Sequence, residues 1–134
     1  MQSETVGNVT LSFEEPDVLH MTWRKSFGER EVDALLAFTA ALRARPDTRL
    51  VLYIDVREAT GIDARSRKKI VELTKAKAFF ASAIVGARVP IRVAVEAIVQ
   101  AARTMSRTIT PTRFFDDDES ARTWLAEVRA SRSA

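Results

Sequence analysis

The sequence contains no cysteine, and its 134 residues include one histidine, one tyrosine, four glycines and four prolines. The absence of cysteine excludes disulfides, thiol nucleophiles and thiolate metal sites. A single histidine also makes a transition-metal site improbable, because such sites draw on several nitrogen or sulfur ligands. Few glycines and prolines argue against long irregular stretches. A chain without cysteine suits a reducing compartment, and we expect it to be cytoplasmic.

Export and membrane-spanning segments are also missing from the sequence. The first ten residues lack a basic stretch followed by an apolar one, so no signal peptide is expected. No apolar run approaches the ~20 residues of a membrane span, so no transmembrane segment is expected. The net charge of +3 is too small to predict nucleic-acid binding by itself.

The length and composition are those of one globular domain. A chain of 134 residues can bury roughly two-thirds of the surface that it exposes when unfolded. Hydrophobic residues make up 46% of the chain and charged residues 29%, which is ordinary for a soluble domain. We expect one domain over residues 5–128, followed by a flexible C-terminal tail at residues 129–134.

Apolar periodicity predicts a hairpin, a helix and then a central strand. Val9–Phe13 and Leu19–Trp23 alternate between apolar and polar residues across a turn, which indicates a β-hairpin. Helical spacing follows from Val32 to Leu42 and should end by Arg45-Pro46. The continuous apolar run Leu50–Ile54 is typical of a strand that is buried on both faces.

The second half of the chain alternates helices with short strands. We expect a loop over Val56–Ile62, followed by a helix over residues 64–74 that Asp63 caps. The remaining predicted elements are a strand at Ala83–Val85, a helix at Ile91–Met105, a strand at Thr112–Phe115 and a last helix with Asp116 and Glu119 in a capping box. The order ββαβαβαβα predicts a single-domain α/β fold with a mixed, mostly parallel sheet.

Residue types that support catalysis are sparse. His20 lies on the outer face of the second strand without an obvious carboxylate partner nearby in sequence. Asp116, Asp117 and Asp118 lack the spacing and glycine turn of a calcium loop and suit the start of a helix. Gly61 and Gly86 are isolated, so no phosphate-binding loop is present. We therefore expect no catalytic residue, no metal and no cofactor, and not an enzyme.

Two helices carry surfaces that could bind a partner or a ligand. Arg65, Arg67, Lys68 and Lys69 cluster at a helix start, which is either a solvated charged face or an anion-binding surface. No aromatic residues interleave with them, which argues against nucleic acid. The helix Ile91–Met105 is apolar over more than half its circumference, from core packing or from a ligand cavity or dimer interface. Its candidate residues are Ile91, Val95, Ile98 and Met105.

The last predicted helix places Ala121, Trp124, Leu125 and Val128 on one face. This spacing predicts that the helix docks on the sheet through that face. We therefore expect Trp124 to be largely buried.

The run Leu50–Asp55, followed by Thr60-Gly61-Ile62-Asp63 at a helix start, resembles the centre of STAS domains, the SpoIIAA-like anti-sigma-factor antagonist fold. Ala83–Gly86 resembles the family's next strand. Arg113-Phe114-Phe115 with Ala121 and Trp124-Leu125 resembles its closing segment. The resemblance covers about residues 8 to 128.

The sequence departs from the family at the switch. In the phosphorylated members Asp-Ser-Ser-Gly opens this helix, whereas this chain has Asp63-Ala64-Arg65-Ser66. Ala64 and Arg65 take the places of the two serines. Ser66 lies about 100° further round the helix, toward Ile70 and Leu73, where a phosphate would meet the core. We predict that no serine at the family position is a phosphorylation switch.

The resemblance implies a regulatory module whose partner is a protein. In the family the corresponding loop and helix meet the partner kinase, so the partner-binding residues are expected within this region: Arg57, Asp63, Arg65, Ser66, Lys68 and Lys69. Some branches of the superfamily are linked to lipid-exchange folds. The alternative is therefore a carrier or sensor of a small hydrophobic ligand, with an enzyme in third place.

Overall fold

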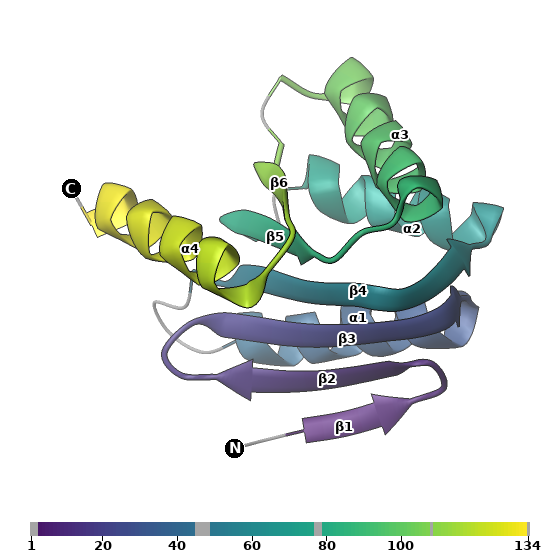
Figure 1. The fold of residues 1–134 in the computed structure, drawn as a ribbon, viewed down its shortest axis with the longest axis horizontal. Coiled ribbons are helices and arrows are strands. Elements are labelled where there is room, and N and C mark those ends of the chain that lie inside the picture. The colour runs from purple at the N-terminus through teal and green to yellow at the C-terminus, as the bar shows by residue number, and fades with distance from the viewer. Residues whose placement is uncertain (1–2, 45–48, 77–78, 108, 134) are drawn as a thin grey trace.

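The computed structural model describes residues 3–44, 49–76, 79–107 and 109–133. The helix end predicted at Arg45-Pro46 lies outside the described residues. The elements in chain order are β1 (Ser3–Val6), β2 (Val9–Glu14), β3 (Val18–Phe27), α1 (Glu29–Arg43), β4 (Val51–Ile62), α2 (Ala64–Lys75), β5 (Ala81–Val85), α3 (Val89–Met105), β6 (Thr112–Phe115) and α4 (Asp118–Ser133) (Figure 1).

One six-stranded sheet runs in the order β1-β2-β3-β4-β5-β6, so strands that are neighbours in the sheet are also neighbours in sequence. β1, β2 and β3 pair antiparallel, whereas β3 through β6 pair parallel. The mixed, mostly parallel sheet and the single-domain α/β fold are thus confirmed. β4 lies between β3 and β5, which confirms the predicted central strand, although the strand begins at Val51 and not at Leu50.

β1 is an additional edge strand that the sequence pattern does not predict. Its residues are exposed or half-buried, and it lacks the apolar alternation that marks β2 and β3. It exists because its backbone pairs with β2, with Ser3 opposite Ser12 and Val6 opposite Val9. The observed order is therefore βββαβαβαβα, with one strand more than expected.

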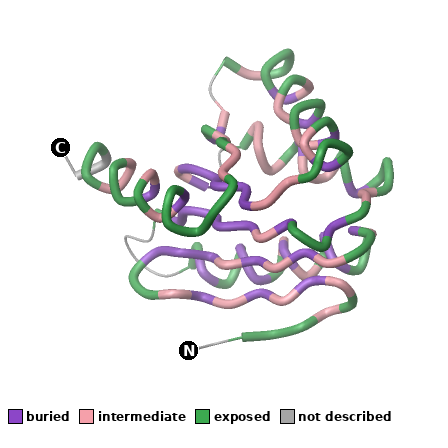
Figure 2. The backbone as a smooth tube through the Cα atoms, in the orientation of Figure 1, coloured by how far each residue is buried: buried purple, intermediate pink, exposed green. Residues whose placement is uncertain are grey.

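The helices are divided unequally between the two faces of the sheet. α1, α2 and α3 pack on one face, where the alternate side chains of β2, β3 and β4 form the main core, including Leu11, Met21 and Ile54. α4 packs alone on the other face, against a smaller cluster that includes Val51, Tyr53 and Ala83. Figure 2 shows buried backbone concentrated in the central strands. The face that carries α4 is therefore only partly covered.

The predicted loop over Val56–Ile62 is wrong, because this segment continues β4. The segment pairs with the end of β3, but with irregular register: Thr22 lies opposite Asp55 and Arg24 lies opposite Glu58. Such bulges add a residue to one strand and interrupt the alternation of its side chains. The segment therefore carries no period-two pattern, although it is a strand.

Glu31 ties the turn between β1 and β2 to the start of α1. Its buried carboxylate accepts hydrogen bonds from the backbone N–H groups of Asn8 at 2.9 Å and Gly28 at 3.0 Å. Burial acts to raise the pKa of Glu31, but the two amide hydrogen bonds outweigh it and the pKa is lowered. Gly7 in this turn has φ +56°, and a side chain there would collide with the Glu31 carboxylate.

α4 is held by apolar contacts and by ion pairs to β2 and to the turn between β2 and β3. Ala121 and Leu125 are fully buried. Arg122 pairs with Glu14, and the Arg129 Nε donates to both carboxylate oxygens of the buried Asp17, at 2.9 and 3.1 Å. The anchored Arg129 lies in the segment that was expected to be a flexible tail, and that segment is helical as far as Ser133.

Two expectations about α4 are wrong. The capping residue is Asp117, whose carboxylate accepts the Ser120 N–H at 2.7 Å, and not Asp116. Trp124 is half-buried, because it lies over the short edge strand β6, where its ring contacts Phe115 at a centroid distance of 5.6 Å. The helical period identified the correct face of α4, but the sheet ends beneath Trp124.

None of the helices in the described ranges is long and apolar enough to cross a membrane.

The burial of α4 predicts unequal effects of truncating its two largest apolar side chains. Leu125→Ala should lower the free energy of unfolding by about 2–5 kcal/mol, as buried leucine truncations do. Trp124→Ala should cost less, because water can fill the space that an edge side chain vacates. Urea denaturation of the two variants measures both values. A larger loss for Trp124→Ala would show that the edge is packed more tightly than described.

Candidate functional site

The start of α2 is held in place by Asp63 and by the end of β3. The Asp63 carboxylate accepts the Ser66 N–H at 2.7 Å, which confirms Asp63 as the N-cap. The Asp63 N–H donates to the Phe27 carbonyl at 3.2 Å. The hydrogen bond from the Ser66 amide lowers the pKa of Asp63, so the cap is ionised at neutral pH. The helix therefore begins at a fixed position, next to the carboxyl ends of β3 and β4.

The basic cluster of α2 divides into two pairs with different neighbours. Arg65 and Lys69, one turn apart, form ion pairs with Glu29 and Asp33 of α1, at 2.7 and 2.9 Å. These contacts join the two helices but neutralise half of the cluster. All four groups are at least one-third exposed, so each ion pair contributes little to stability.

Arg67 and Lys68 make up the outward part of the cluster. Both residues are exposed, and neither forms an ion pair within the described part of the chain. They follow the capped first turn of α2, whose backbone is fixed. Of the charged residues predicted for partner binding on α2, Lys68 is therefore the one that remains available, together with Arg67.

Ser66 lies inside the protein. Its exposed fraction is 0%, and its Oγ has no hydrogen-bond partner among the described residues. The side chain thus points inward, as its position on the helix predicts. A phosphate there would be buried, and it would lie at the same helix start as the Asp63 carboxylate, which repels it. That this position is not a phosphoserine switch stays a prediction.

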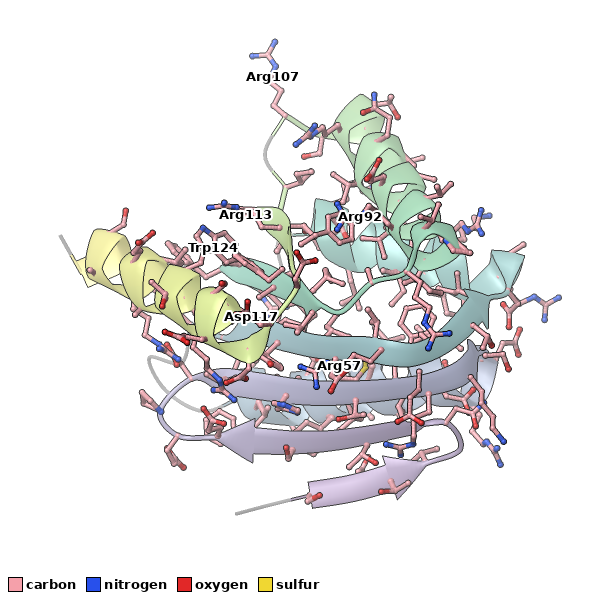
Figure 3. All side chains as sticks on the ribbon, in the orientation of Figure 1. Arg57, Arg92, Arg107, Arg113, Asp117 and Trp124 are labelled. Atoms are coloured by element: carbon pink, nitrogen blue, oxygen red, sulfur yellow. The ribbon has the colours of Figure 1, made fainter. Side chains whose placement is uncertain are left out.

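Arg57 makes its described contacts elsewhere. It lies in the bulge of β4 between Asp55 and Glu58, and its N–H and Nε lie 3.1 and 3.9 Å from the Asp55 carboxylate. Its aliphatic stem lies against Gly86, whose φ of +78° and lack of a side chain make room for it. Figure 3 labels Arg57 on the sheet. The described contacts of Arg57 involve β4 and the end of β5, and none involves α2.

The predicted ligand-binding residues of α3 have three different environments. Ile91 and Ile98 are buried in the core, and Val95 is half-buried. Met105 is 61% exposed at the end of the helix. Val95 and Ile98 line a cavity of about 80 Å³ between α2, α3 and the sheet. Its wall is mostly apolar, and the polar residues that line it are Thr74, Ser82, Thr110 and Thr112.

His20 belongs to a polar cluster under the start of α4 that the sequence does not reveal. The His20 ring stacks on Tyr53 at a centroid distance of 4.7 Å, and the Tyr53 hydroxyl donates to Asp118 at 2.5 Å. Arg122 lies over the Tyr53 ring at 4.6 Å. Burial, and then Arg122, lower the pKa of His20, while burial raises that of Tyr53. The cluster fastens α4 to the sheet.

Metal-binding groups are absent from the described ranges, where no three residues of histidine, cysteine, aspartate or glutamate gather in a way that could hold an ion.

His20, Tyr53 and Asp118 come from three elements that meet only in the fold. A register in which His20 opposes Tyr53 would have been the signal for the cluster, and that register follows from strand pairing.

The buried, unpaired hydroxyl of Ser66 predicts very different effects on stability for two substitutions. Ser66→Ala should change the free energy of unfolding by less than about 1 kcal/mol, because it removes a buried group without a partner. Ser66→Asp should lower it by about 3 kcal/mol or more, because it buries an unpaired charge at the helix start that Asp63 caps. Urea denaturation tests both. A stable Ser66→Asp variant would indicate that the side chain turns outward.

The lowered pKa of His20 predicts a loss of stability in mild acid. The unfolded chain protonates His20 near pH 6.5, above the pKa in the folded state, so stability falls as the pH drops from 6.5 toward the folded value. Glu14, Asp55 and Asp118 oppose this effect, and Arg122 reinforces it. Between pH 7.5 and 5.5, His20→Gln should therefore lose less stability than the parent. Equal losses in parallel denaturation series would contradict the assignment.

No family model matches the sequence, and no curated protein matches it. Solved structures share its architecture, among them the following two. An uncharacterised DUF3478-family protein with a SpoIIAA-like fold from Shewanella loihica PV-4 is 19% identical, covers 93% of this chain and 98% of its own, and superposes with a TM-score of 0.63. The unphosphorylated anti-sigma factor antagonist SpoIIAA is 11% identical, with coverages of 90% and 97% and a TM-score of 0.57. The resemblance is confirmed for the fold: the chain has a SpoIIAA-like fold.

Proposed function

We propose that this chain is a non-enzymatic regulatory module that binds a protein partner through the start of α2, without a phosphoserine switch. The observation that supports it is the exposed pair Arg67 and Lys68 on a helix start that Asp63 and the α1 ion pairs hold rigid. The similar structure of an anti-sigma factor antagonist makes protein binding the leading class of function.

The predicted partner surface is narrower than the sequence suggests. Arg65 and Lys69 serve the contact with α1, Ser66 is inside, and Arg57 contacts β4 and β5. Lys68 and Arg67 therefore carry the charge that a partner meets. A partner with an acidic patch would complement them, and its binding should weaken with salt.

Charge reversal at this surface tests the proposal. Arg67→Glu with Lys68→Glu should abolish capture of the partner while leaving stability nearly unchanged, because exposed charges contribute little to folding. Arg103→Glu with Arg107→Glu is the matched control, since it reverses two exposed arginines at the end of α3 and in the segment that follows it. Each immobilised protein is exposed to native cell extract, and the retained proteins are quantified by mass spectrometry.

The expected result is a protein that the parent and the control retain and the α2 variant loses. If all three baits retain the same proteins in equal amounts, the start of α2 is not the binding surface. Reversal of Arg65 and Lys69 is avoided, because new carboxylates would face Glu29 and Asp33 and would disturb the fold.

A carrier or sensor of a small hydrophobic ligand is the second candidate, because an apolar cavity lies under α3. Its volume of about 80 Å³ is well below the ~300–1,000 Å³ of pockets that enclose drug-sized ligands. A lipid would therefore require α3 to move away from the sheet. Native mass spectrometry of the purified protein distinguishes the candidates, since a carrier retains a bound small molecule.

A further inference from the structure

β6 leaves one edge of the sheet open. It is the last strand of the sheet, and within the described part of the chain its one partner strand is β5. α3 and α4 belong to opposite faces, and β6 lies between them at the upper border of the sheet in Figure 1. Its side chains on both faces are exposed or half-buried.

The pairing with β5 determines which backbone groups of β6 point outward. The carbonyls of Pro111 and Phe115 accept hydrogen bonds from Ser82 and Gly86, at 2.8 and 2.9 Å. Because backbone groups alternate in direction along a strand, those of Thr112 and Phe114 point away from β5. Within the described residues, no backbone hydrogen bond outside the sheet reaches these two residues.

Aromatic and arginine side chains flank the open edge on both faces. On the α4 face, the Arg113 guanidinium lies 5.4 Å from the Phe115 ring and 5.5 Å from the Trp124 ring. These three residues line a groove of about 290 Å³ whose rim includes Glu119 and Glu127. Figure 3 shows Arg113 and Trp124 beside each other. On the opposite face, Arg92 lies over Phe114 at 4.7 Å.

We propose that β6 pairs antiparallel with β6 of a second copy of this chain, around a two-fold axis at Phe114. Each Phe114 then donates its outward N–H to the carbonyl of the partner's Phe114. Thr112 lies opposite the partner's Asp116, and Arg113 lies opposite the partner's Phe115. Both sheets join into one of twelve strands.

The side chains of β6 favour this register over its neighbours. Outward backbone groups must face each other, so the register can change only in steps that preserve this alternation. One step places Arg113 opposite the partner's Arg113, where like charges repel. The opposite step pairs Phe114 with the partner's Asp116, which has already left the strand to begin the turn into α4. The Phe114 register avoids the repulsion between arginines and places Asp116 only at the two ends of the paired segment, opposite Thr112 of the other copy.

The strand is complementary to itself, which is why a second copy is the proposed occupant. Both Arg113 guanidinium groups gain an aromatic ring of the other chain, and the two Phe114 rings meet on the opposite face. Tryptophan, arginine and aromatic residues are those that most often dominate binding at protein interfaces. This pairing does not involve α2, so it can be tested independently of the proposed function.

Sedimentation equilibrium over a range of concentrations tests the pairing. The parent should shift reversibly from the mass of one chain to that of two. Phe114→Pro removes the outward N–H and no hydrogen bond to β5, and Phe114→Ala is the matched control that loses the same side chain but keeps the N–H. Dimerisation should weaken about tenfold or more in the proline variant relative to the alanine variant.

The absence of native cysteine allows a direct test of the register. In the proposed dimer the two Phe114 positions oppose each other within disulfide range, whereas the two Arg113 positions are too far apart to be bridged. Phe114→Cys should form a disulfide dimer under mild oxidation at least about tenfold faster than Arg113→Cys. Arg113→Cys mixed with Phe115→Cys should cross-link to each other.

Three outcomes would overturn the proposal. The first is a parent chain that stays monomeric at all concentrations, which would leave the edge to another protein's strand or to none. The second is a dimer that Phe114→Pro and Phe114→Ala affect equally. The third is cross-linking of Arg113→Cys as fast as that of Phe114→Cys.

Discussion

The parallel pairing of β3 with β4 is the interaction on which the rest of the structure depends. It runs from Val18 opposite Val51 to Phe27 opposite Ile62, and it continues as the hydrogen bond from Asp63 to Phe27. Because β3 and β4 end together, α1 and α2 begin side by side at the carboxyl ends of these strands. This common origin brings Glu29 and Asp33 of one helix to Arg65 and Lys69 of the other.

Local sequence predicted the elements whose signals are local. The hairpin, the central strand and the Asp63 cap follow from alternation, a continuous apolar run and one capping side chain. β1 and the bulged end of β4 are different, because backbone pairing with another strand makes them strands and their side chains carry no periodic signal. Trp124 shows the same limit: its helix face was predictable, but the width of the sheet beneath it was not.

The candidate site was predictable in place and not in detail. The sequence identifies a basic helix start, but which cations remain available depends on α1, which lies more than thirty residues earlier in the chain. Likewise, His20 gains its partners from β4 and α4 only when the strands are in register. The burial of Ser66 was the exception, since the angle between successive helical residues is a local property.

The sequential strand order also bears on how the chain can fold. Each strand pairs with the strand that precedes it, so the sheet can grow from the N-terminus without waiting for distant segments. Sheets with such local connections have a lower entropic cost of loop closure than sheets whose neighbouring strands are far apart in sequence. α4 is the exception, because Arg129 reaches back across 112 residues to Asp17 in the turn between β2 and β3. That contact joins α4 to the turn between β2 and β3, so this part of the fold is completed only after all the segments between them are in place.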